Sequence, residues 1–332
     1  MKYQLIYTDH NSEEHLHQLM HPYFFLAVYN DIREHSKFID FIGKNRHKKW
    51  FIFSDYCLDD KNKPNNVLTF SILAITDIDQ FDLLKNIIEL LQPKDIKKSK
   101  IINPNFMKFI SSLPIFNISI IVPKNRNFIK AFKFDEIEYF KMRYKSLENY
   151  YCRLHNFPIN DHSFKNIIKD LRYIQNKFNA KSISLNKFRD IEIITSVISA
   201  ISILISTENS DFPTEIIWVS DRDSLLTFEK SNLSMPLIFN IAHATFRSFL
   251  KTNSQLLFYH YIDESKPEYD SFNRIPDIVA GSLADMSPKT VTNKKFIPIL
   301  KDYLTLESKN YVAKLYFEED KYGLNQLKLE KN

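Results

Sequence analysis

Three aspartates stand at the borders of apolar runs, where a folded chain could bring their carboxylates together. Asp55 closes the run FIFSD, Asp221 closes the run IIWVSD, and Asp277 opens the run DIVAG. Carboxylate oxygens are ligands that Mg²⁺ and Mn²⁺ prefer, and cations held in this way can promote the hydrolysis of phosphodiester bonds. We therefore predict that Asp55, Asp221 and Asp277 are catalytic and bind Mg²⁺ or Mn²⁺.

Each of these aspartates also has an ordinary structural interpretation. Asp55 could begin a polar turn, and Asp221 could cap a helix, since aspartate accepts hydrogen bonds from free backbone amides there. Asp277 could be a helix cap as well, but a carboxylate among apolar residues is costly to bury unless a cation or a basic group pairs with it. We expect Asp285, two helical turns beyond Asp277, to lie at the surface.

Further charged residues stand close to these candidates in the sequence. Asp223 is another candidate metal ligand, and Arg222 before it could contact a substrate phosphate or remain in solvent. The charged loop KDIKKSK offers Asp95 as a metal ligand and Lys98 as a phosphate-binding residue. A solvated loop is the simpler interpretation of that segment.

The apolar pattern predicts an α/β fold. Strand character is found in residues 50–54, 67–76, 116–122, 215–220 and 255–262, and helices are predicted for residues 79–91, 106–113, 236–250 and 272–284. A longer helical section is predicted over about residues 135–206. Strands and helices in this order favour a mixed sheet with helices on its faces.

The basic stretch KNRHKK marks a domain boundary near residue 48. Before it, residues 2–8 and 23–29 have strand character and residues 31–43 have helical character. We therefore predict an N-terminal α/β extension over residues 1–48 and a core over residues 49–290, with a helical insertion over about residues 135–207. Residues 291–332 are predicted to be a tail that packs on the core.

Composition narrows the functional classes. The chain has 332 residues, of which 44% are hydrophobic, so it can bury a sizeable core. Its 3 glycines form no glycine-rich phosphate loop, which argues against dinucleotide-binding and P-loop proteins. The net charge of +5 favours a nucleic-acid partner, although the abundance of Lys, Asn, Ile and Phe is also what an A+T-rich coding sequence produces.

The cysteine residues and the apolar runs indicate in which cellular compartment the protein is expected. Cys57 and Cys152 have no spacing typical of a zinc site or a redox pair, so we expect reduced thiols in a cytoplasmic protein. The longest apolar run, residues 191–205, is too short to cross about 30 Å of hydrocarbon, and we expect no association with a membrane.

Three other patterns are weaker candidates for a site. His17 and His21 have a spacing that suits a metal on a helix, but a solvated face is the simpler interpretation. Asp9 also ends a strand-like run and is a reserve candidate for the acid of the first strand. The segment YFKMRYK, residues 139–145, interleaves bases with aromatic residues that could stack on nucleic acid, although half of a helix there must be core.

The ordered set of motifs resembles the family of ribonuclease H-like proteins catalogued as domain of unknown function 3800. Members have a strand ending in Asp-Glu-Ser, a Glu-x-Lys segment, a strand closing on Asp, and a helix reading Ala-Asp-Leu-Ile-Ala-Gly. FIFSDYCLDD, DIKKSK, IIWVSDRDS and IPDIVAGSLADM occur in that order over residues 50–287. Asp95 and Lys97 match the Glu-x-Lys segment, whereas Tyr56 and Pro276 replace a glutamate and an alanine of the family.

The resemblance implies a ribonuclease H-like mixed sheet flanked by helices and a metal-dependent nuclease that acts on DNA or RNA. Arg222, Lys97 and Lys98 would then contact the substrate. The resemblance also implies a role in phage defence or mobile-element biology, with a protein partner in such a system. The alternative is a non-catalytic module of this fold that binds nucleic acid or a partner protein, and Tyr56 is the departure that keeps this alternative open.

Overall fold

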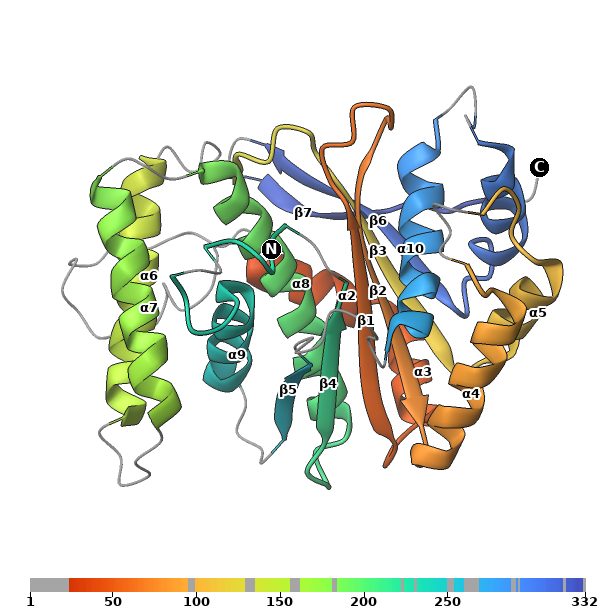
Figure 1. Ribbon diagram of the computed structural model, residues 1–332, viewed down its shortest axis with the longest axis horizontal. Helices are drawn as coiled ribbons and strands as arrows, with labels where there is room; N and C mark the ends of the chain where they lie inside the picture. Colours follow the sequence, from red (N-terminus) through yellow and green to blue (C-terminus); the bar gives the residue numbers. More distant parts are fainter. Residues whose placement is uncertain are drawn as a thin grey trace.

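The computed structural model describes residues 24–94, 99–128, 135–155, 162–180, 184–221, 224–229, 232–249, 254–259, 269–287, 291, 293–318 and 321–330. These residues form an α/β structure in which helices cover both faces of a mixed β-sheet (Figure 1).

In the described part of the chain, the sheet has seven strands in the order β5-β4-β1-β2-β3-β6-β7. Their bounds are β1 Lys49–Cys57, β2 Asn66–Ile75, β3 Ile115–Val122, β4 Glu215–Ser220, β5 Gln255–Tyr259, β6 Asn310–Glu318 and β7 Lys321–Gln326. The first three strands form an antiparallel meander, whereas β4 lies parallel to β1 and β5 lies parallel to β4. On the other side, β6 is parallel to β3, and β7 returns antiparallel to β6.

The central strands are apolar on both faces because both faces are covered. All ten residues of β2 and all eight residues of β3 are buried. A strand buried on both sides reads as a continuous apolar run rather than an alternation, which is why these segments were predictable from the sequence.

One face of the sheet is covered by the helices α4 Ile78–Leu91, α5 Pro104–Ser112 and α10 Asp270–Asp285, together with a short 3₁₀ turn at Lys294–Phe296 and a π-helical turn at Ile299–Tyr303. We call it the α10 face. The opposite face, which we call the α8 face, is covered by α2 Phe25–Arg33, α3 Ser36–Lys44, α8 Leu185–Glu208 and α9 Leu237–Phe249. The helices α6 Glu136–His155 and α7 His162–Asn179 form a hairpin beyond α9, away from the sheet (Figure 1).

The helix α8 is long and apolar enough to cross a membrane by length and composition alone. Of its most apolar window, 94% is buried inside the structure. Its apolar surface therefore packs against neighbouring elements of this fold, and a polar residue such as Ser199 bonds the backbone of α9 by donating to the Ala242 carbonyl oxygen at 3.3 Å.

The structure corrects two expectations for the ends of the chain. Residues 23–29 were predicted as a strand, but α2 begins at Phe25, because Phe25, Val28 and Ile32 recur at helical spacing and are all buried. The C-terminal residues were predicted as a tail, but β6 and β7 belong to the sheet itself. Residues 2–8, Asp9, His17 and His21 lie outside the described residues.

Candidate acidic site at the carboxyl ends of β1 and β4

Asp55 and Asp221 lie side by side at one edge of the sheet. The strands β1 and β4 are parallel neighbours, with Ser54 opposite Ser220. The backbone N–H of Asp221 donates to the carbonyl oxygen of Ser54 at 2.9 Å, which continues the pairing one residue further. Because parallel strands end at the same edge, the two aspartates are brought together as the sequence predicts.

Both aspartates belong to the α10 face of the sheet. Side chains alternate along a strand, and Phe53 and Val219 pack in the core of the α10 face, while Trp218 packs in the core of the α8 face. Asp55 comes two residues after Phe53, and Asp221 comes two residues after Val219. Both aspartates therefore lie on the α10 face as well. Asp55 is buried, with 6% of its surface exposed, and Asp221 is half-buried.

Tyr56 points to the opposite face, where it ties β1 to β4. Its hydroxyl lies 2.8 Å from the Ser54 hydroxyl and accepts a hydrogen bond from the Ser220 hydroxyl at 3.1 Å. The indole N–H of Trp218 donates to the Ser54 hydroxyl at 3.0 Å. Tyr56 therefore belongs to a buried hydrogen-bonded network on the α8 face, on the side of β1 opposite to Asp55.

Asp277 lies on α10, the helix that covers this face of the sheet, and two contacts of α10 relate its course to that of β1. The ring of Phe272 stacks on that of Phe53 at 5.0 Å, and α10 runs in the direction of β1 towards Asn65 in the hairpin, which bonds the Leu283 carbonyl oxygen at 2.9 Å. Asp277 is about 7.5 Å along the helix from Phe272 and Asp55 about 6.6 Å along the strand from Phe53.

The local setting of Asp277 differs from the expectation in one respect. One structural interpretation makes Asp277 a helix cap, but α10 begins at Asp270 and Asp277 lies within it, one residue after an internal proline, Pro276. The helix-cap interpretation of Asp277 is therefore wrong. Its side chain is half-buried.

The expectation for Asp285 is wrong as well. Only 3% of this residue is exposed, and its carboxylate accepts the backbone N–H of Asn293 at 2.9 Å. Asp285 therefore joins the last turn of α10 to the segment that follows it. The sequence offered no sign of this bond because Asn293 lies in a different segment of irregular structure.

The described acids fit a metal ion in type but do not form a complete ligand set. Among the residues that the structure describes, no three histidine, cysteine, aspartate or glutamate side chains gather closely enough to hold a metal ion. Asp55 and Asp221 are neighbours, and Asp277 does not join them in such a group. The other predicted site residues, Asp95, Lys97, Lys98, Arg222 and Asp223, lie outside the described residues.

A lysine that the sequence analysis missed lies close to the acids. Burial raises the pKa of the Cys57 thiol, Lys63 opposes that shift, and the charges of Asp55 and Asp60 add to it. These four groups therefore share one neighbourhood at the β1–β2 hairpin. The ammonium group of Lys63 also lies 5.7 Å from the centre of the Phe296 ring, which is a cation–π contact. Lysine in a polar turn has no pattern that marks it out.

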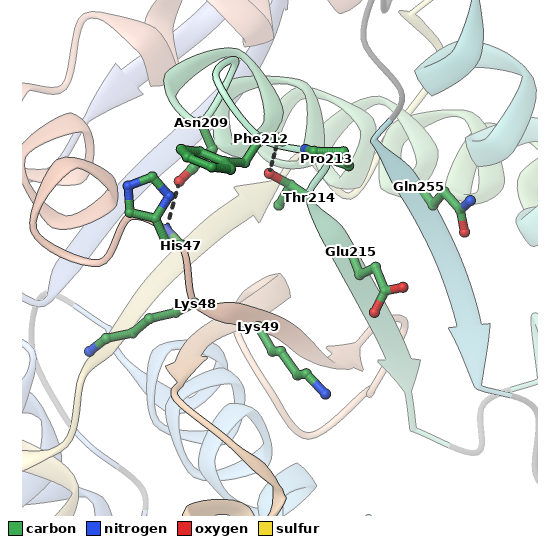
Figure 2. Close-up of a pocket in the computed structure, with 9 residues that line it drawn as sticks. All are labelled: His47, Lys48, Lys49, Asn209, Phe212, Pro213, Thr214, Glu215 and Gln255. Carbon is green, nitrogen blue, oxygen red and sulfur yellow. Dashed lines mark hydrogen bonds between the residues drawn. The ribbon is translucent and has the colours of Figure 1, made fainter.

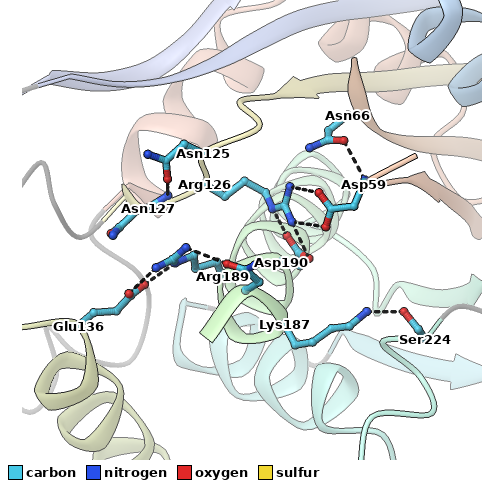
Figure 3. A network of polar contacts seen from close by, with 11 residues as sticks. Asp59, Asn66, Asn125, Arg126, Asn127, Glu136, Lys187, Arg189, Asp190 and Ser224 are labelled. Atoms are coloured by element: carbon cyan, nitrogen blue, oxygen red, sulfur yellow. Dashed lines mark hydrogen bonds and ion pairs between the residues drawn. The ribbon is translucent and has the colours of Figure 1, made fainter. Parts of the chain in front are cut away.

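A second polar cluster stands at the same edge on the α8 face (Figure 3). Arg126 donates to both carboxylate oxygens of Asp59, at 2.9 and 2.7 Å, and forms an ion pair with Asp190 on α8. Arg126 and Asp190 are both buried, at 3% and 4% exposure. Hydrogen bonds from Arg126 lower the pKa of Asp59, whereas burial raises the pKa of Asp190 to about 6.

Lys187 extends this cluster towards the segment after β4. Its ammonium group donates to the hydroxyl of Ser224, three residues beyond Asp221 (Figure 3). The start of α8 is thereby tied to the chain that leaves the acidic edge. The cluster joins the hairpin after β1, the loop after β3 and α8, none of which are adjacent in sequence.

The opposite edge of the sheet carries a hollow of about 490 Å³ (Figure 2). It lies at the amino ends of β1, β4 and β5 and is lined by His47, Lys48, Lys49, Asn209, Phe212, Pro213, Thr214, Glu215 and Gln255. The imidazole of His47 meets the Phe212 ring edge-on at 4.4 Å. Ligands of sheets with parallel strands bind at the carboxyl ends, so this hollow is separate from the acidic site.

Comparisons with protein-family models, with curated proteins and with solved structures found no match to this chain.

Proposed function

We propose that this protein is a metal-dependent nuclease with a ribonuclease H-like sheet. The observation that carries the proposal is the pairing of Asp55 and Asp221 at the carboxyl ends of neighbouring parallel strands, on the face that α10 covers. The strand order supports it, because an antiparallel meander extended by two parallel strands places the ends of β1 and β4 together. Asp277, on the helix that covers this face, is one candidate for the third acid of the site.

The residues present are suited to Mg²⁺ or Mn²⁺, which prefer carboxylate oxygens. Asp55 and Asp221 would hold the ion, with Asp277, Asp223 or Asp95 supplying the remaining carboxylate. A bound divalent cation activates water and stabilises charge on the scissile phosphate. Within this chain, α10 shields the acids from bulk water and Lys63 supplies positive charge beside them. Arg222, Lys97 and Lys98 are predicted to contact the substrate.

The proposal is tested with single variants Asp55→Asn, Asp221→Asn and Asp277→Asn, each of which removes a charge while keeping the size of the side chain. Cleavage of labelled single- and double-stranded DNA and RNA is measured in EDTA, Mg²⁺ and Mn²⁺. We expect each variant to lose at least about 100-fold in rate, because metal stabilisation of charge contributes several kcal/mol. The matched control is Asp82→Asn, which changes an exposed aspartate on α4 and should cleave as the wild type does.

Thermal unfolding supplies an independent measurement. Clustered carboxylates repel one another, so a cation that binds them should raise the Tm of the wild type and raise that of Asp221→Asn less. Equal cleavage by the wild type and the Asp277 variant would remove α10 from the site. A wild type that cleaves none of the four substrates with either cation would overturn the nuclease proposal.

A second candidate function is a non-catalytic module that binds nucleic acid or a partner protein. It is favoured by the observation that no third described acid joins Asp55 and Asp221 in a ligand group. Such a module would show no metal-dependent rise in Tm, which separates it from the first proposal. A place in phage defence or mobile-element biology rests on the resemblance alone.

A further inference from the structure

The α6–α7 hairpin buries most of its aromatic residues and exposes most of its basic residues, although Arg143 is buried and pairs with Glu192 of α8. Tyr139, Tyr144 and Tyr151 on α6 are buried, and the ring of Phe140 stacks on Phe178 of α7 at 5.6 Å. The aromatic residues of the segment YFKMRYK are therefore largely core, and the predicted stacking on nucleic acid does not apply to them. The bases of the hairpin must be considered by themselves.

Three bases form one stripe along the exposed side of α7. Lys165, Lys169 and Arg172 follow one another at intervals of four and three residues, so they project from the same side of the helix. Each of the three is exposed. The opposite side of α7 carries the buried residues Ile168, Leu171, Ile174 and Phe178. Because the apolar side of α7 is buried, the stripe of bases faces solvent.

A buried glutamate joins this stripe to α6. The carboxylate of Glu148 accepts hydrogen bonds from Lys145 at 2.8 Å, from Arg172 at 2.7 Å and from Gln175 at 3.0 Å. Burial opposes its ionisation, but these bonds outweigh burial and lower its pKa to about 2. Glu148 is therefore ionised at neutral pH and holds the two helices in register.

The part of the hairpin that contains the stripe exposes bases but no acids, whereas Glu138, in the first turn of α6, is 60% exposed and pairs with Lys141. Among described residues 145–155 and 162–176, the exposed charged side chains are those of Lys145, Arg153, Lys165, Lys169 and Arg172, which we call the basic face. Both carboxylates in these ranges are buried. Glu148 is 4% exposed, and Asp170, 2% exposed, accepts the backbone N–H of Ser234 at 2.9 Å. Even with Lys145 and Arg172 paired to Glu148, the exposed surface of this part of the hairpin carries a net positive charge.

We propose that the basic face binds the phosphate backbone of nucleic acid. It would then anchor the substrate at a second surface, at a distance from the acidic edge. This inference rests on the proposed nuclease function and adds a binding surface to it. Lys165 and Lys169 are about 6 Å apart along the helix axis, and Arg172 is about 4.5 Å further. Measured along the axis of a duplex, that length covers about three base pairs, at about 3.4 Å of rise each.

The surroundings of the basic face favour nucleic acid over an anionic membrane. A helix that binds a membrane surface buries large apolar side chains beside its bases. The large apolar side chains that are exposed in the described part of the chain are Ile78, Leu83, Leu90, Ile101, Phe212, Phe249 and Leu257, and none belongs to α6 or α7. Contact with phosphates needs only charge, which the hairpin provides on a rigid support.

The test compares Lys165→Gln/Lys169→Gln with the matched control Lys85→Gln/Lys108→Gln, which removes two lysines from α4 and α5. Arg172 is kept in both, so that the bridge to Glu148 stays intact, and folding is checked by thermal unfolding. Binding of fluorescein-labelled 20-base-pair DNA and RNA duplexes is measured in EDTA at several NaCl concentrations. Plots of log K against log [NaCl] should become shallower by about 1.8 in the first variant, since each phosphate contact contributes about 0.9.

The control variant should keep the wild-type slope. An unchanged slope in Lys165→Gln/Lys169→Gln would overturn the proposal, and so would binding to vesicles of anionic lipid without binding to either duplex. Because EDTA excludes cleavage, the two proposals fail separately. Binding with the expected slope but no cleavage in Mg²⁺ would remove only the nuclease, whereas cleavage with an unchanged slope would remove only the basic face.

Discussion

Glu148 in the α6–α7 hairpin and Asp190 at the acidic edge are both buried carboxylates that contact an arginine, yet their pKa values shift in opposite directions. The pKa of Glu148 falls to about 2, and that of Asp190 rises to about 6. Glu148 receives three hydrogen-bond donors of its own. Asp190 shares Arg126 with Asp59, whose negative charge further opposes its ionisation.

The difference shows that the direction of the pKa shift of a buried carboxylate depends on how many hydrogen-bond donors it receives. The presence of an ion pair alone does not decide it. The donors of Glu148 are half-exposed, so they keep much of their own hydration while bonding it. Arg126 is itself buried and must satisfy two carboxylates from inside the protein. The first arrangement is redundant, and the second depends on one side chain.

The largest effect should come from Arg126→Met. The change leaves Asp190 buried beside Asp59 without its cation, and breaking a buried pair in this way costs about 3–5 kcal/mol. Urea unfolding at pH 7.5 would measure it. Because a protonated Asp190 needs no cation, the cost should shrink at pH 5. Arg153→Met, an exposed arginine on α6, is the control and should stay within about 0.5 kcal/mol. A loss under about 1 kcal/mol would show that Asp190 is already satisfied without Arg126.

A smaller effect should appear in the pH dependence of the two carboxylates. The folded pKa of Asp190 lies above the unfolded value of about 3.9, so its contribution to stability is lost as pH rises from about 4 to 6. The folded pKa of Glu148 lies below the unfolded value of about 4.3, so its contribution is lost as pH falls from about 5 to 2.

The variants Asp190→Asn and Glu148→Gln separate these two contributions. Unfolding free energies at pH 3, 4.5 and 7 would be compared with the wild type, and each difference should change by about 1–3 kcal/mol across its own window. The sign is the informative part. As pH rises, the unfolding free energy of Asp190→Asn should increase relative to that of the wild type. Over the same rise in pH, the unfolding free energy of Glu148→Gln should decrease relative to that of the wild type. Parallel curves for the two variants would contradict the opposite pKa shifts.

The positions of Asp55 and Asp221 at the edge of the sheet were predictable from the sequence because a local pattern marks where each strand ends. Asp55 and Asp221 each follow an apolar run that is largely buried, and two parallel runs of this kind end at one edge. The cluster around Arg126 was not predictable by such means. Its members Asp59, Arg126 and Asp190 are separated by more than 60 residues and meet only through tertiary packing.

Other misses have the same origin. Asp285 is expected at the surface from its position two helical turns beyond Asp277, but the segment around Asn293 bonds its carboxylate. The strands β6 and β7 contain charged residues such as Lys314 and Lys321, whose side chains are exposed, so their apolar pattern was too weak to show that they extend the sheet. The helices α6, α7 and α8 were predictable because 3.6-residue periodicity is a local property.

The smallest effect should come from Lys145→Met, which removes one of the redundant donors of Glu148. Arg172 and Gln175 remain, and pairs at this helical spacing contribute about 0.2–0.5 kcal/mol, so the unfolding free energy should fall by about that amount. The difference should vanish in about 1 M NaCl, where screening acts within about 3 Å. Lys165→Met on the same hairpin serves as the control for loss of surface charge. A loss of about 3 kcal/mol or more, as large as that expected for a buried pair, would show that Glu148 depends on Lys145 as Asp190 depends on Arg126.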